Sequence, residues 1–177
     1  GDALKGPGFR GAGWPWWKID QYAWGFGRTI LAIDPARKKV LWQHRETEPL
    51  DTRAMCLKGE RLFFYSHRKY LGCLNTKTGE TVWKTDEPAV LDAIGEHHPA
   101  QFPATGFATS AYAKCSDDAI YFAGPTRTKL VAVSAKDGKL LWHYPQGAFQ
   151  LVLRDNTLYA LGANQPSQKF HPLTGEV

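Results

Sequence analysis

The sequence predicts an all-β protein in which four-stranded antiparallel sheets follow one another along the chain. Three observations carry this prediction. Short apolar stretches with an alternating pattern are separated by turns that contain glycine. One hairpin pattern recurs at an interval of about 40 residues. Aromatic residues make up 13% of the chain, with seven tryptophans, which suits sheets braced by large side chains.

The clearest copy of the hairpin is Leu130–Trp142. Val131 and Val133 alternate with small residues before the turn, and an apolar run resumes after it. Gly138 lies within the sequence Lys-Asp-Gly-Lys, where it can supply the positive φ that a tight hairpin loop requires. This is an ordinary hairpin signal, and its importance comes from its repetition.

Two more copies share this spacing, Cys73–Trp83 and Ala32–Trp42, each with a small residue ten positions before its tryptophan. Glycine lies four positions before the tryptophan at Gly79 and Gly138, whereas Lys38 takes that place in the first copy. A fourth copy ends at the last residue, before its tryptophan would appear. Repetition of short strands with this period predicts a β-propeller or another β array.

The register also extends upstream of each hairpin. Cys56 precedes Trp83 by 27 residues, and Cys115 precedes Trp142 by the same interval. The complete set of strands predicts blades at residues 14–43, 54–84, 111–143 and, incomplete, 150–177. Residues 44–53, which are charged and include Pro49, are expected to cross the surface between the first two blades.

This pattern resembles the tryptophan-docking repeat of the quinoprotein, or PQQ-like, β-propellers. The resemblance covers nearly the whole chain and implies that residues 1–177 are a fragment of one propeller domain. It also implies a structural docking role for the tryptophans and the turn glycines, namely Trp42, Trp83, Trp142, Gly79 and Gly138. The family includes PQQ-dependent dehydrogenases and cofactor-free scaffolds, so the fold does not by itself determine the function.

Residues 87–110 interrupt the period, because 59 residues separate Trp83 from Trp142 against 41 between the preceding tryptophans. We expect a short helix at Pro88–Ile94, with proline in its first turn, followed by a loop that leaves the blade. His97 and His98 lie in this insertion. Adjacent histidines in an extended chain point to opposite sides and no third ligand is spaced to join them, so no metal site is predicted.

The sequence does not determine whether the three cysteines are oxidised or reduced. Cys56 and Cys115 hold equivalent places in the innermost strands of consecutive blades, whereas Cys73 lies in a third strand. We expect two small buried core residues, and the alternative is a site or a bridge between neighbouring blades. The aromatic cluster Trp14–Trp17 leaves a similar choice between packing and a platform for a ring-shaped or sugar ligand.

Ligands of a propeller bind at the face that carries the loops from each outermost strand to the next blade. Loops between the second and third strands share that face. The candidate residues are Asp51, Arg53, Thr109, Ser110, His97 and His98. Asp51 and Arg53, with Thr109 and Ser110, are of the types that bind a carboxylate or phosphate. Solvated loop residues, or an ion pair that holds the ring together, are the alternative interpretation.

The charge, the apolar runs and the repeat pattern of the sequence limit the partners that we expect for this chain. The net charge is +5 and no run of five basic residues occurs, so nucleic-acid binding is not expected. No apolar run of 18 residues occurs, so no transmembrane span is expected. The chain starts at Gly-Asp-Ala-Leu and stops inside a repeat, which predicts that further blades of the same propeller are missing.

The predicted function is an extracytoplasmic or periplasmic binding or scaffold module, with a protein or a small molecule on the loop face. The alternative is part of an alcohol or sugar dehydrogenase that uses PQQ and calcium. Such enzymes carry a vicinal cysteine pair, a calcium site made by Glu, Asn and Asp, and an aspartate base. No two cysteines are adjacent here, and no calcium ligand or catalytic residue can be assigned by position.

Overall fold

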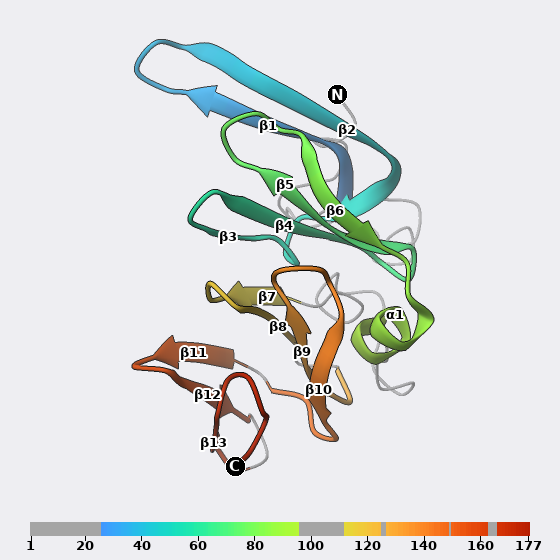
Figure 1. The fold of residues 1–177 in the computed structure, drawn as a ribbon, viewed down its shortest axis with the longest axis vertical. Coiled ribbons are helices and arrows are strands. Elements are labelled where there is room, and N and C mark those ends of the chain that lie inside the picture. The colour runs from blue at the N-terminus through green and yellow to red at the C-terminus, as the bar shows by residue number, and fades with distance from the viewer. Residues whose placement is uncertain (1–25, 96–111, 125–126, 149, 163–165) are drawn as a thin grey trace, which may run out of the picture.

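A computed structural model describes residues 26–95, 112–124, 127–148, 150–162 and 166–177. Four antiparallel sheets follow one another in chain order from the top to the bottom of Figure 1, with one short helix beside them. The prediction of an all-β propeller with four-stranded antiparallel blades is confirmed, since the second and third sheets each contain four strands. The helix lies where it was expected.

The first sheet pairs β1 (Phe26–Asp34) with β2 (Lys39–Asp51). The predicted surface crossing at residues 44–53 was wrong, because β2 continues through most of it and pairs with β1 as far as Phe26. Charged residues are tolerated in this strand because alternate side chains point toward the second sheet, where Glu46 meets charged partners.

The other three sheets repeat one simple antiparallel order. The second sheet contains β3 (Cys56–Lys58), β4 (Arg61–Ser66), β5 (Tyr70–Asn75) and β6 (Thr81–Thr85). The third contains β7 (Tyr112–Cys115), β8 (Ala119–Ala123), β9 (Leu130–Ser134) and β10 (Leu140–Tyr144). The fourth contains β11 (Gln150–Arg154), β12 (Thr157–Leu161) and β13 (Gln168–Phe170).

Apolar side chains fill the space between neighbouring sheets, so the central strands are buried on both faces. Phe64 packs toward the first sheet with Ile30 and Leu74, whereas Phe63 and Tyr65 pack toward the third. This follows from the alternation of side chains along β4, and it explains why β4 reads as a continuous apolar run. A separate cluster that includes Leu158 and Phe170 joins the third sheet to the fourth.

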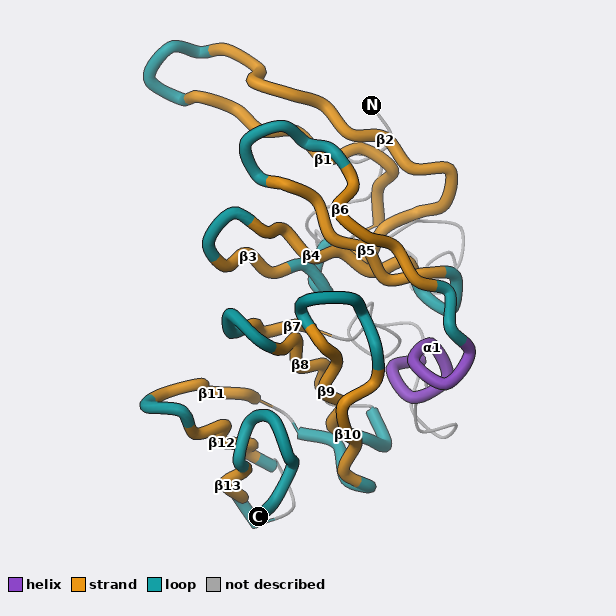
Figure 2. Tube along the Cα trace, viewed as in Figure 1, coloured by secondary structure: helices purple, strands orange, loops and turns teal. Residues whose placement is uncertain are grey.

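Helix α1 (Pro88–Gly95) follows β6 and packs against the core between the second and third sheets (Figure 2). Val90 and Ile94 are almost completely buried there. The start of the insertion therefore belongs to the blade interface, and its remainder, residues 96–110, lies outside the described residues. Among the described residues, none of the helical segments has the length and the apolar character that a membrane-spanning helix requires.

Each of the first three sheets has a bulge immediately before its repeat tryptophan. Ala32 pairs with Trp42 and Ile33 with Val40, which leaves Leu41 as the extra residue. Val82 and Leu141 occupy the same place in the next two sheets. All three bulge residues are exposed, so the bulge turns an apolar side chain outward and redirects the tryptophan that follows.

The turns between the first and second strands of a sheet lie on the side opposite to the turn between its second and third strands. In Figure 1 the β3–β4, β7–β8 and β11–β12 turns point to the left, whereas the β4–β5 turn and α1 lie on the right. We call the side that carries the β4–β5 turn and α1 the loop face. The antiparallel strand order assigns the β2–β3 and β10–β11 connections and the β8–β9 turn to the same face. Of the predicted ligand-binding positions, Asp51 at the end of β2 and Arg53 in the β2–β3 connection lie on this face.

Candidate functional site

Arg53 and Arg68 both lie near Arg127 on the loop face, and we call these three residues the arginine cluster. Arg53 follows β2, Arg68 lies in the β4–β5 turn, and Arg127 lies between β8 and β9. Arg68 adopts a left-handed backbone with φ of 55°. Arg53 and Arg68 both lie close enough to Arg127 to lower its pKa by charge repulsion.

Asp51 is the carboxylate of this region and is completely buried. Its Oδ1 accepts the backbone N–H of Arg53 at 3.1 Å and lies 3.5 Å from Arg53 Nε. Its backbone carbonyl accepts the N–H of Ala54 at 3.0 Å. These bonds hold the turn between β2 and β3, and they use the carboxylate to fix the Arg53 backbone and guanidinium.

Arg127 is only 6% exposed, and its Nη1 donates to the carbonyl oxygen of Ile94 at the end of α1, at 2.9 Å. Burial lowers the pKa of Arg127, and the neighbouring Tyr65 and Asp51 oppose that effect. Tyr65 is buried as well; its burial raises the pKa of its hydroxyl, which accepts the backbone N–H of Arg68 at 3.0 Å. Arg127 therefore anchors the helix, while Arg68 is exposed and Arg53 half-buried.

The structure brings Asp51 and Arg53 together, as two of the sequence-predicted positions. His97, His98, Thr109 and Ser110 lie outside the described residues, as do Trp14–Trp17. Sequence reasoning missed Arg68 and Arg127. Their position between the second and third strands of a blade is the signal that could have found them, because that turn shares the loop face.

The three repeat tryptophans make equivalent contacts with the following sheet. Trp42 Nε1 donates to the carbonyl oxygen of Thr76 at 2.8 Å, Trp83 to that of Ala135 at 3.1 Å, and Trp142 to that of Pro172 at 2.9 Å. Each ring also covers a glycine of left-handed conformation, the pairs being Trp42–Gly79, Trp83–Gly138 and Trp142–Gly175. Each tryptophan thus caps the turn of the next repeat.

Comparison with known proteins agrees with this geometry. Residues 29–157 match the family model described as outer membrane protein assembly factor BamB, a PQQ-like repeat model. This chain belongs to the PQQ-like repeat family. The matched segment starts in β1 and ends at the start of β12, so it includes the three tryptophan hairpins of the PQQ-like repeats.

The proteins similar to this chain carry different descriptions. A quinoprotein ethanol dehydrogenase of Pseudomonas putida is 38% identical over 56 residues, which is 32% of this chain and 9% of that protein. BamB from Moraxella catarrhalis superposes with a TM-score of 0.58 at 14% identity, over 85% of this chain and 42% of that one. A europium-containing methanol dehydrogenase gives a TM-score of 0.56 at 14% identity, over 85% of this chain and 38% of that one. These similarities establish the fold, and the chain spans less than half of each of these proteins.

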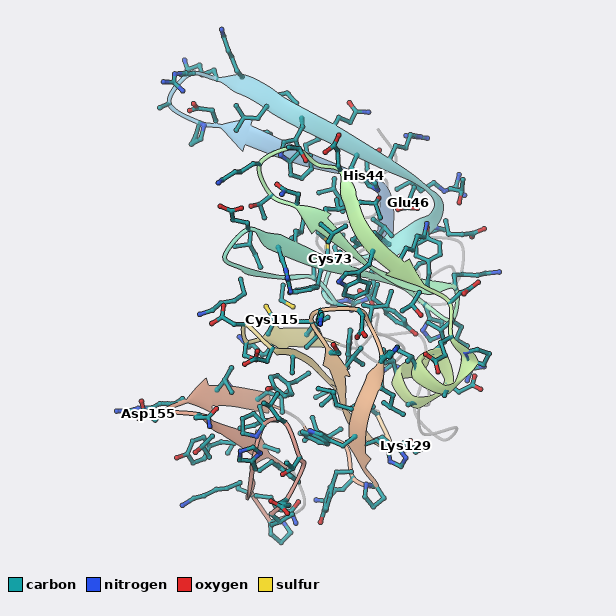
Figure 3. All side chains as sticks on the ribbon, in the orientation of Figure 1. His44, Glu46, Cys73, Cys115, Lys129 and Asp155 are labelled. Atoms are coloured by element: carbon teal, nitrogen blue, oxygen red, sulfur yellow. The ribbon has the colours of Figure 1, made fainter. Side chains whose placement is uncertain are left out.

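A polar network joins the first two sheets of PQQ-like repeats in this chain (Figure 3). Glu46, which is 8% exposed, lies 2.9 Å from His44 Nε2 and 2.6 Å from Lys84 Nζ. His44 Nδ1 lies 3.1 Å from the carbonyl oxygen of Gly79, and Lys84 Nζ lies 3.6 Å from the centre of the Tyr70 ring. Burial raises the pKa of Glu46, but hydrogen bonds from His44, Lys84 and Tyr70 outweigh it and bring that pKa below its ordinary value.

Among the described residues, no group of three or more His, Cys, Asp or Glu side chains is placed to hold a metal ion. The three cysteines are free thiols. Cys73 is buried in the second sheet, whereas Cys56 and Cys115 are half-buried where β3 faces β7. The expectation that both would be fully buried core residues is therefore only partly met.

Proposed function

We propose that this chain is part of an extracytoplasmic PQQ-like propeller that acts as a binding or scaffold module. In this proposal the loop face receives carboxylate groups of a partner protein. The arginine cluster is the observation that supports it. Guanidinium groups bind carboxylates through paired, charge-assisted hydrogen bonds, which makes arginine well suited to such a surface.

The charges of the cluster favour a negatively charged partner. The guanidinium groups of Arg53 and Arg68 both lie within electrostatic range of Arg127, and Asp51 is the carboxylate among the described groups that act on Arg127. Asp51 is committed to the β2–β3 turn through its bonds to Arg53. Arg53 lies in the β2–β3 connection and Arg68 in the β4–β5 turn, so a docked segment that pairs with both arginines would contact both loops.

Arg53 and Arg68 are the residues to test, because Arg127 is buried and holds α1. The probe is a fluorescent peptide rich in aspartate and glutamate, titrated with the 177-residue chain and followed by anisotropy. We expect Arg53→Gln and Arg68→Gln each to weaken binding by about 5–20-fold, and high salt to weaken binding by the unchanged chain.

Arg154→Gln is the matched control. Arg154 is highly exposed, and it lies beside the β11–β12 turn on the opposite side of the molecule. The proposal expects Arg154→Gln to bind the peptide as the unchanged chain does. Equal loss in all three variants would indicate a general charge effect and would contradict a specific site on the loop face.

The second candidate function is part of a PQQ- and calcium-dependent dehydrogenase, which the similarity to the quinoprotein ethanol dehydrogenase favours. The arginine cluster has the charge to pair with an anionic cofactor, whereas the described residues contain no group of three or more His, Cys, Asp or Glu side chains placed to hold a metal ion. Calorimetric titration of PQQ with and without calcium chloride separates the two functions. The scaffold proposal expects no binding tighter than 1 μM in order of magnitude, whereas a submicromolar Kd would favour the enzyme.

A further inference from the structure

Cys56 and Cys115 meet at the interface between the second and third sheets. Cys56 is the first residue of β3 and Cys115 is the last residue of β7, and these two strands pack against each other. Both cysteines contact the same buried cluster of apolar side chains. Figure 3 shows Cys115 on β7 between the second and third sheets.

The two thiols are near enough for each to shift the pKa of the other. The Cys56 thiol lowers the pKa of Cys115, burial opposes this effect, and Lys58 and Lys114 lower the pKa further. The Cys115 thiol raises the pKa of Cys56, as does burial. Cys115 is therefore the thiol that is favoured to deprotonate first, which leaves Cys56 to attack the mixed disulfide that forms on Cys115.

The neighbourhood of the pair is open to a small reagent. A cavity of about 250 Å³ lies between the β3–β4 turn and the residues after β7, lined by Lys58, Phe63, Ser116 and Asp117 among others. The ion pair of Lys58 Nζ with Asp117 Oδ2, at 3.7 Å, crosses the same interface, which shows that the end of β3 and the residues after β7 lie side by side. Both cysteines are half-buried, and Cys115 directly precedes Ser116 in the lining of this cavity.

We infer that Cys56 and Cys115 are a modification site, at which a disulfide donor such as oxidised glutathione or a protein disulfide oxidant forms a covalent bond between the second and third blades. Neither the family similarity nor the proposed function assigns this bond. Because it would join two strands of different blades, it would lock the interface where β3 meets β7. An oxidising, extracytoplasmic compartment is where such a bond persists.

The reaction proceeds by two thiol–disulfide exchanges. The Cys115 thiolate attacks the external disulfide, forms a mixed disulfide and releases one thiol. Cys56 then loses its proton and attacks the Cys115 sulfur, which releases the second thiol. The protein loses two electrons and two protons, and the external disulfide takes up both to become two thiols.

Cys73 provides an internal control. It is completely buried, and burial raises the pKa of its thiol to about 11. Trypsin cleaves after Arg and Lys and therefore separates the three cysteines into different peptides, residues 54–58, 70–77 and 115–127. Mass spectrometry can then identify which cysteines are linked.

The experiment incubates the 177-residue chain with oxidised glutathione in excess, blocks free thiols with iodoacetamide and digests the protein. The inference expects peptides 54–58 and 115–127 joined in a monomer on a non-reducing gel. The same link is expected in Cys73→Ala and is lost in Cys56→Ser and Cys115→Ser. Recovery of both peptides as alkylated thiols, a link that involves Cys73, or a link between two chains would each overturn it.

A second measurement does not depend on digestion. Closing the interface should raise the melting temperature of the oxidised chain by about 5–15 °C over that of the chain reduced with dithiothreitol. In Cys56→Ser the two treatments should give the same melting temperature, while Cys73→Ala keeps the difference. A rise that persists in Cys56→Ser would also contradict the inference.

Discussion

The indole ring of Trp83 lies against the α-carbon of Gly138 in the next sheet. A side chain at Gly138 would place its Cβ 2.7 Å from Cζ3 of Trp83, which is closer than real contacts allow. Gly138 also has φ of 77°, a conformation that glycine adopts without cost. Both the space beside the Trp83 ring and the positive φ therefore require glycine at position 138. Suitable variants can measure the two contributions separately.

Gly138→Ala should destabilise the chain more than Gly59→Ala does. Gly59 also has a positive φ, of 58°, but nothing lies within 4 Å of a Cβ built there. Gly59→Ala should therefore cost only the conformational term, about 1–2 kcal/mol. We expect Gly138→Ala to cost about 1–3 kcal/mol more, measured by urea unfolding, because the Trp83 ring must move. Equal losses would show that the ring can shift freely.

Trp83→Ala should remove about 3–5 kcal/mol of unfolding free energy, as for other large aromatic residues at a packed interface. Trp83→Phe should restore part of the packing but not the hydrogen bond to the carbonyl oxygen of Ala135. Val82→Ala is the control in the same strand. Val82 is 51% exposed in the bulge, so its truncation should change stability by about 0.5 kcal/mol or less. A Trp83→Ala variant with an unchanged melting temperature would contradict the proposed structural role of this residue.

Glu46→Gln should destabilise the chain at neutral pH by about 1–3 kcal/mol, because it removes the charge that His44, Lys84 and Tyr70 support. The pair of Glu60 with Lys77 is the matched control, since both side chains are largely exposed. Lys77→Gln should change stability by less than about 1 kcal/mol, whereas Lys84→Gln should have an effect close to that of Glu46→Gln. Chemical denaturation at pH 7 compares the three.

The effect of Glu46 should depend on pH in a defined direction. Its pKa in the folded chain lies below the ordinary 4.5, so the stabilisation is present above that value and is lost as the pH falls through the folded pKa. The difference in unfolding free energy between the unchanged chain and Glu46→Gln should therefore be constant near neutral pH and shrink in acid. A difference that stays the same from pH 7 to about pH 3 would refute the assignment.

The outer face of the first sheet should promote self-association of the 177-residue chain. Ile33 and Val40 are a cross-strand pair, each 57% exposed, and Leu31 is 48% exposed on the same side of β1. Apolar residues grouped on an exposed sheet face favour contact with another chain. Static light scattering should show oligomers that Ile33→Lys and Val40→Lys reduce. Lys169→Glu, on β13, is the control and should leave the average mass of the oligomers unchanged. An equal reduction in this variant would indicate a general charge effect and would contradict the prediction.

Sequence alone determined the secondary structure class and the repeat. Alternating apolar residues specify strands, and glycine is readable as a left-handed turn residue because other side chains adopt that conformation at a cost. The same reasoning does not account for Lys38, which has a φ of 52° at the equivalent turn position although it is not glycine. It also failed at residues 44–51, where charged side chains suggested a surface crossing but form part of a strand.

The tertiary structure decided which residues meet. Each tryptophan finds its carbonyl partner 30 to 52 residues further along the chain, and the register of neighbouring blades selects that partner. The buried carboxylate of Glu46 is tolerated within a strand because Lys84 from the next sheet pairs with its charge. Cys56 and Cys115 occupy equivalent positions in consecutive repeats of the sequence. Equivalent positions in two repeats need not be in contact in the folded chain. The packing of β3 against β7 supplies that contact, because blades that stack in register bring equivalent residues of their inner strands together.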